Sequence, residues 1–141
     1  MKTSLLIIIG ASAATLVVIV AVAILIFRSK RRRNYPAIVH EKWLDVQRLC
    51  SSKETWALAV INADKLLEDA LKRTRFKGKS IGERLVAAQR KLSDNDGVWF
   101  AHNLSKKLIA ETNSKLREAD VKKALIGVRQ ALRDLGAMND K

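Results

Sequence analysis

Asp64 and His102 are a carboxylate and an imidazole, two residue types that can carry out proton transfer. A carboxylate that hydrogen-bonds an imidazole orients the ring as a general base, as the Asp does in a Ser-His-Asp triad. The simplest interpretation of Asp64 is different: with Glu68 and Asp69 it forms a solvated acidic helix face, with pairs such as Glu68–Lys72. The second hypothesis is that Asp64 points inward and anchors a base such as His102.

The sequence gives less support to a metal site, a cysteine nucleophile or a phosphate-binding loop. His40 and His102 fall on different predicted helices, and neither has a Cys or a second His at ligand spacing. Cys50 is most simply a small apolar residue near a helix end rather than a nucleophile. Gly78 and Gly82 are isolated and do not form a phosphate-binding loop. We therefore expect no metal site, no cofactor and no enzymatic activity.

The residues from Leu5 to Phe27 carry no charge and are almost entirely apolar. A helix of this length is about 34 Å long, enough to cross a hydrocarbon core of about 30 Å. A cleaved signal peptide is the competing interpretation, because Lys2 precedes the stretch and Ala21-Val22-Ala23 resembles a cleavage site. The apolar stretch is too long for that interpretation, and a basic cluster follows it directly. The sequence therefore predicts a membrane anchor.

The basic cluster predicts the orientation of this anchor. By the positive-inside rule, cations next to a span stay in the cytoplasm, so we expect the N-terminus outside and the rest of the chain inside. The cluster needs no role beyond this signal and contact with anionic headgroups; a nucleic-acid patch is the weaker alternative. Its members are Arg28, Lys30, Arg31, Arg32 and Arg33.

Beyond the span, apolar residues recur at helical spacing and no stretch alternates with period two. The predicted fold is all-α, with one transmembrane helix followed by an antiparallel bundle of four to five helices. The expected division is a flank (1–4), the span (5–27), a basic juxtamembrane segment (28–35) and a cytosolic bundle (36–138). The predicted bundle helices run from Pro36 to about Cys50, Ser51 to Arg73, Ser80 to Leu92, Val98 to Glu111 and Leu116 to Leu135.

Signals for helix ends support this division. Ser51 with Glu54, and Ser80 with Glu83, have the spacing of a capping box. Residues 93–97 are predicted to form a turn before the fourth of these helices. Gly136 is well placed to terminate the last helix.

Two parts of the sequence resemble a known class of proteins. They are residues 56–67 with the turn at 77–85, and residues 99–104 with the helices that follow. Together they resemble small bacterial membrane-anchored helical bundles related to the HEPN (higher eukaryote and prokaryote nucleotide-binding) class. Active HEPN domains cut RNA with an Arg-x4-6-His motif. On this chain the Arg position falls on Ser105 and the His position on Ala110, so the resemblance implies the fold and argues against the activity.

These observations lead to three hypotheses of function. The first is a non-enzymatic scaffold or interaction module at the bacterial plasma membrane, which binds a protein or a second copy of itself through residues such as Lys106 and Lys107. The second is a tethered RNA-binding module, because residues 34–141 carry 21 Lys and Arg against 14 acidic residues. The third is an atypical ribonuclease that depends on His102.

Overall fold

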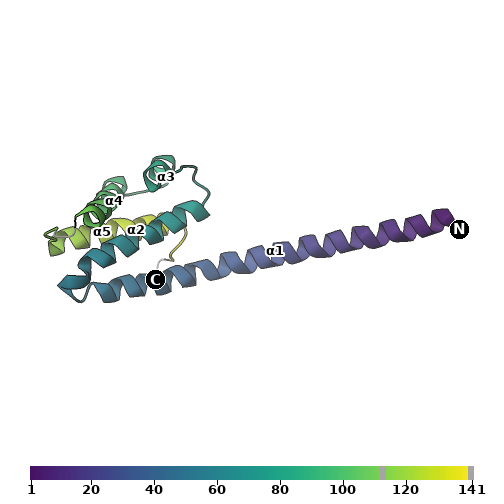
Figure 1. Cartoon of the computed structure of the whole chain (residues 1–141), viewed down its shortest axis with the longest axis horizontal. Coiled ribbons are helices and arrows are strands. Elements are labelled where there is room, and N and C mark those ends of the chain that lie inside the picture. Colours follow the sequence, from purple (N-terminus) through teal and green to yellow (C-terminus); the bar gives the residue numbers. More distant parts are fainter. Residues whose placement is uncertain (112–113, 140–141) are drawn as a thin grey trace. The chain divides into compact units, whose positions relative to one another are not determined.

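The computed structural model describes residues 1–111 and 114–139, apart from the side chains of residues 2–12 and 32–33. Its helices are α1 (Lys2–Leu49), the 3-10 helix η1 (Lys53–Thr55), α2 (Trp56–Arg73), α3 (Ile81–Ala88), α4 (Asn95–Ala110) and α5 (Glu118–Asp134), as labelled in Figure 1. No strand occurs in the described part of the chain. The prediction of an all-α protein with a long apolar N-terminal helix is confirmed.

The chain divides into two compact units, unit 1 (Met1–Tyr35) and unit 2 (Pro36–Lys141). Helix α1 extends through the boundary and contains Pro36 in its interior. The prediction of a separate helix that begins at Pro36 is therefore wrong. Proline cannot donate a backbone hydrogen bond, but a helix can continue past it when only that one bond is lost. The missing bond falls at the boundary between the units.

Unit 1 consists of the apolar part of α1. Large apolar side chains between Leu16 and Phe27 are exposed over about half of their surface or more, and Phe27 is 78% exposed. Among the described residues, the helix from Ala13 onward is long and apolar enough to cross a membrane. An apolar surface of this extent is unfavourable in water.

Unit 2 is built around α2. This helix contacts α3, α4 and α5, and α4 also contacts α5. Apolar residues recur along α2 at three- and four-residue spacing, which places them on the side that faces the other helices. Full burial of a leucine or valine side chain contributes about 1.5–3 kcal/mol. The largest fully buried apolar side chains are Leu67, Leu71, Leu85, Leu132, Val39, Val60, Val98 and Val128.

The last turns of α1 also belong to unit 2, and α2 runs back alongside them (Figure 1). Val39, Trp43 and Val46 are buried on this side of α1. Lys42 Nζ lies 3.9 Å from Asp69 Oδ2, which joins the two helices at the surface. Only residues 50–55 connect α1 to α2, and Lys42, before this connection, lies beside Asp69, well after it. The two segments are therefore antiparallel.

Some of the helix ends lie where the capping residues in the sequence predicted them. Ser80 caps α3 by accepting a hydrogen bond from the Glu83 backbone N–H at 3.2 Å, as predicted. Gly136 follows Leu135, the C-cap of α5, and has a positive φ of 67°, so its predicted role is confirmed. The predicted capping box at Ser51 and Glu54 is wrong, because η1 intervenes and Ser51 donates instead to the Arg48 carbonyl.

The start of α4 differs from the expectation as well. Its first residue is Asn95, three residues before the predicted start at Val98. Asp94 caps the helix, and its carboxylate accepts the Gly97 backbone N–H at 2.9 Å. A single Asp at the N-cap is sufficient to begin a helix within a stretch whose composition resembles a turn.

Candidate functional site

Asp64 of α2 and His102 of α4 form a buried polar pair. The His102 Nδ1 atom lies 3.1 Å from Asp64 Oδ2 and 3.3 Å from Oδ1. The two residues are only 8% and 7% exposed. Because an ionised carboxylate can only accept hydrogen bonds, Nδ1–H of His102 is the donor when Asp64 is charged. The structure thus brings together the two residues that the second sequence hypothesis paired.

The apolar faces of α2 and α4 hold this pair in place. Asp64 directly follows Ala63, which is buried, and lies one turn after Val60 on the inner side of α2. His102 follows the buried Ala101 on α4. The ring of Trp99, one turn earlier on α4, meets the imidazole edge-on, with centroids 6.1 Å apart and planes at 67°. The carboxylate and the aromatic ring together fix the orientation of the imidazole.

This arrangement shares one feature with a catalytic triad, the carboxylate that orients a histidine. A triad also needs a nucleophile within hydrogen-bond reach of the other imidazole nitrogen. Ser105 lies on α4 one turn after His102 and is 1% exposed. Among the described residues, however, no hydrogen bond joins the Ser105 hydroxyl to His102. The geometry is that of a buried hydrogen-bonded link between two helices.

Cys50 occupies a different place, at the turn that follows α1. Its thiol donates to the Val46 carbonyl, with Sγ and O 3.3 Å apart. Burial raises the pKa of the Cys50 thiol. A raised pKa lowers the fraction of thiolate, which is the nucleophilic form. The local environment therefore agrees with the interpretation of Cys50 as a packing residue.

The two positions that correspond to the HEPN motif lie in different environments. Ser105 is buried, whereas Ala110 is exposed at the last position of α4. A separation of five residues places them on different sides of the helix. Lys106 and Lys107 between them are exposed. The motif positions thus do not converge on one site.

The predicted orientation cluster lies on α1. Arg28, Lys30 and Arg31 are exposed, and the side chains of Arg32 and Arg33 lie outside the described part. His40, further along α1, is also exposed. Within the described residues no group of His, Cys, Asp and Glu side chains is arranged to hold a metal ion.

A charged groove between the last turns of α1 and α2 was missed by sequence reasoning. It has a volume of about 310 Å³. Acidic and basic side chains both line the groove. The sequence feature that could have indicated it is the high density of charged residues on the outer face of α2. The lining residues are Lys42, Asp45, Val46, Asn62, Lys65, Leu66 and Asp69.

Comparison with known proteins identifies no relative: no family model, no curated protein and no solved structure matches this chain.

Proposed function

We propose that the chain is a single-pass membrane protein whose unit 2 is a non-enzymatic interaction or scaffold module on the cytoplasmic side of a bacterial plasma membrane. The observation that carries this proposal is the exposed apolar surface of α1 between Leu16 and Phe27, followed directly by a cluster of cations. Lipid would cover that surface, and the cations would remain among the headgroups of the inner leaflet.

The architecture that we infer for unit 2 is an antiparallel helical bundle. The contacts of α2 with α3, α4 and α5, and of α4 with α5, support this arrangement. A relation to the HEPN class stays a prediction that rests on the sequence resemblance alone.

The local chemistry of the polar residues supports a non-enzymatic role. His102 is enclosed and uses one ring nitrogen to bind Asp64. Ser105 is buried without a hydrogen bond to that histidine, and Ala110 supplies no functional group. A general base must come within hydrogen-bond reach of its substrate, and burial of His102 opposes this approach.

The partner that we propose is a protein or a second copy of this chain, bound through α4. Lys106 and Lys107 are adjacent and exposed there. To test this, a photoreactive residue would replace Lys106 or Lys107 in the full chain in its native membrane. Lys91 is a matched control, because it is also an exposed lysine but lies outside α4. We expect a discrete protein adduct or a covalent dimer from positions 106 and 107 and not from 91. The same adducts from all three positions would contradict the proposal.

A tethered RNA-binding module is the second candidate, favoured by the cationic surplus of residues 34–141. Its affinity for RNA would fall steeply as salt rises, because binding releases counterions. A gel-shift titration of the purified chain at low and high salt would distinguish the candidates. Retention of RNA at low salt that disappears at high salt would favour this second function.

A further inference from the structure

The loop between α2 and α3 presents three cations, Arg75, Lys77 and Lys79, which we call the basic loop. All three are exposed. The stretch from Thr74 to Gly82 contains no acidic residue. None of the three cations forms an ion pair with another described residue.

Arg75 has a backbone conformation that normally favours glycine, with φ = 63°. It follows the C-cap of α2, where its N–H donates to the Lys72 carbonyl at 3.1 Å and the Phe76 N–H donates to the Leu71 carbonyl at 3.3 Å. These two bonds define a Schellman motif, in which glycine is the usual residue at the left-handed position. An L side chain there is strained. A strained residue at an exposed position points to a role for its side chain, here a guanidinium.

The loop is also held at its other end. The Lys79 backbone N–H donates to the Glu83 carboxylate at 2.7 Å. The backbone of Gly78 lies so close to α3 that a β-carbon there would be 2.8 Å from the Arg84 nitrogen. A loop fixed at both ends presents its cations in a defined geometry, which reduces the entropy lost when they bind a ligand.

The acidic residues nearest to this end of α2 already have cationic partners. Glu68 lies 2.8 Å from Lys72 Nζ and 3.8 Å from Arg84 Nη1. Asp69 lies 3.9 Å from Lys42 Nζ. Glu83 is the acidic residue that contacts the basic loop, through the Lys79 N–H, and its single negative charge does not balance the three cations. The basic loop therefore carries a net positive charge.

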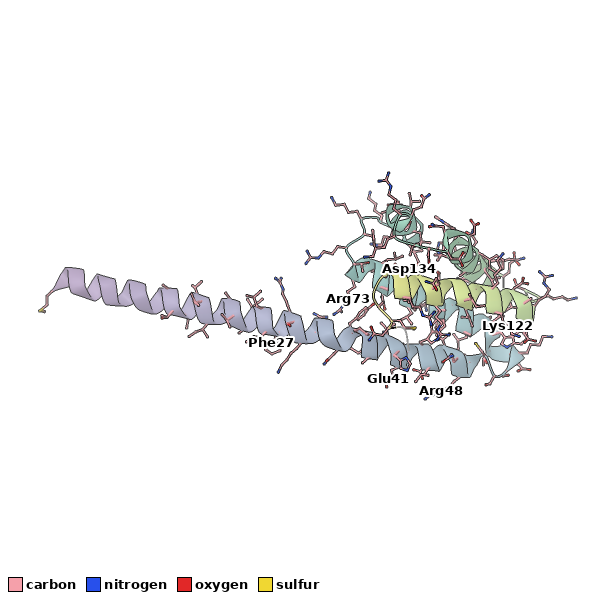
Figure 2. All side chains as sticks on the ribbon, turned by 180° about the vertical axis from the view of Figure 1, so that it is seen from behind. Phe27, Glu41, Arg48, Arg73, Lys122 and Asp134 are labelled. Atoms are coloured by element: carbon pink, nitrogen blue, oxygen red, sulfur yellow. The ribbon has the colours of Figure 1, made fainter. Side chains whose placement is uncertain are left out.

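The basic loop lies at the end of unit 2 where the chain enters from unit 1. The antiparallel pairing of Lys42 with Asp69 places Arg73, at the end of α2, beside the first residues of unit 2. In Figure 2 the labelled Arg73 and Lys122 lie at opposite ends of this unit.

We propose that the basic loop binds the anionic headgroups of the membrane that α1 crosses, and that this contact holds unit 2 against the lipid surface. The proposal rests on the proposed function, because a membrane anchor is what brings the loop near lipid. Each Lys or Arg near an anionic surface strengthens binding about fivefold, and high salt screens the attraction. RNA could also bind such a loop, but the apolar segment is covalently joined to the first residue of unit 2, and this tether favours lipid.

Amine footprinting of the full chain in nanodiscs tests the proposal. One set of discs contains phosphatidylcholine alone, and the other also contains phosphatidylglycerol. The rate of acylation of Lys77 and Lys79 by a small reagent is measured by mass spectrometry. Lys53 is the control, because it is an exposed lysine at the opposite end of α2. We expect the rates at Lys77 and Lys79 to fall at least about threefold in anionic discs at low salt and to recover in high salt, with Lys53 unchanged.

Arg75→Gly tests the loop without a risk of misfolding, since glycine relaxes the backbone. We expect this variant to lose part of the protection at Lys77 and Lys79, whereas Arg75→Lys retains it. Equal rates in both kinds of disc would overturn the proposal, as would protection by added RNA in neutral discs without protection by anionic lipid. Failure of the chain to enter discs at all would count against the membrane anchor, so the two proposals fail separately.

Discussion

Gly127 of α5 lies directly against the backbone of Gly97 in α4. A β-carbon at Gly127 would be 2.5 Å from the Gly97 carbonyl carbon and 2.6 Å from its oxygen. Both neighbours are backbone atoms, so neither can move aside as a flexible side chain would. The close packing of α5 on α4 therefore depends on the absence of a side chain at Gly127.

Gly127→Ala should destabilise unit 2 by about 1–3 kcal/mol, because the new methyl group forces the helices apart. Gly82→Ala is the matched control, since its β-carbon would meet Trp99 at 3.6 Å, an ordinary contact. We expect that control to be neutral or stabilising by up to about 1 kcal/mol, because alanine favours a helix. Urea unfolding followed by tryptophan fluorescence measures both effects. Equal stability of the two variants would contradict the close crossing.

His102→Ala should cost about 3–5 kcal/mol, because it leaves the Asp64 carboxylate buried without its partner. The double variant Asp64→Leu/His102→Leu should recover most of that loss, since no polar group remains buried without a partner. Chemical unfolding of Asp64→Leu, His102→Leu and the double variant gives the coupling between the two residues. Additive effects would show that the two side chains do not interact.

Arg75→Gly should stabilise the chain by about 1–2 kcal/mol through release of the left-handed strain. Arg75→Ala is the control, because it removes the same charge but keeps a β-carbon. Thermal unfolding in detergent compares the variants. A rise in midpoint for alanine equal to that for glycine would assign the effect to charge rather than to the backbone.

Asp134 should contribute to the acid sensitivity of unit 2. Burial acts to raise its pKa, but hydrogen bonds from the Ser93 backbone N–H, the Ser93 hydroxyl and the Gln130 amide outweigh it, so the pKa lies below its ordinary value. A carboxylate with a lowered pKa stabilises the fold above its unfolded pKa of about 3.9, and this stability is lost as pH falls through the lowered value.

The variant Asp134→Asn should therefore show a shallower loss of stability than the wild type as the pH falls below about 4. Unfolding titrations at a series of pH values measure this slope. Ser93→Ala removes one of the donors and should give an intermediate slope. Identical slopes for Asp134→Asn and the wild type would contradict the role assigned to this carboxylate.

The helices with strong local signals could be predicted from the sequence. The end of α2 at Arg73, the cap at Ser80 and the glycine after α5 depend on residues close together in the chain. The continuation of α1 through Pro36 could not be predicted, because proline suits the first turn of a helix and also occurs inside helices when one lost bond is tolerated.

The sequence indicated the Asp64–His102 pair only as one of two hypotheses. Asp64 and His102 are 38 residues apart, and their contact depends on how α2 packs on α4 rather than on any local pattern. The left-handed backbone at Arg75 left no trace in the sequence, since the residue that normally marks this conformation is glycine. The three cations of its loop can be read in the sequence, but the fixed geometry of the loop depends on contacts with α2 and α3.

We propose that α1 crosses the membrane with unit 2 in the cytoplasm, and labelling with a membrane-impermeant maleimide distinguishes this topology from the alternatives. In a Cys50→Ser background, one variant carries Thr3→Cys and the other Asn139→Cys. In intact cells we expect labelling at position 3 only, and labelling at position 139 only after the cells are opened. Labelling of position 139 in intact cells would contradict the orientation, and release of the chain from membranes by alkaline carbonate would contradict the anchor itself.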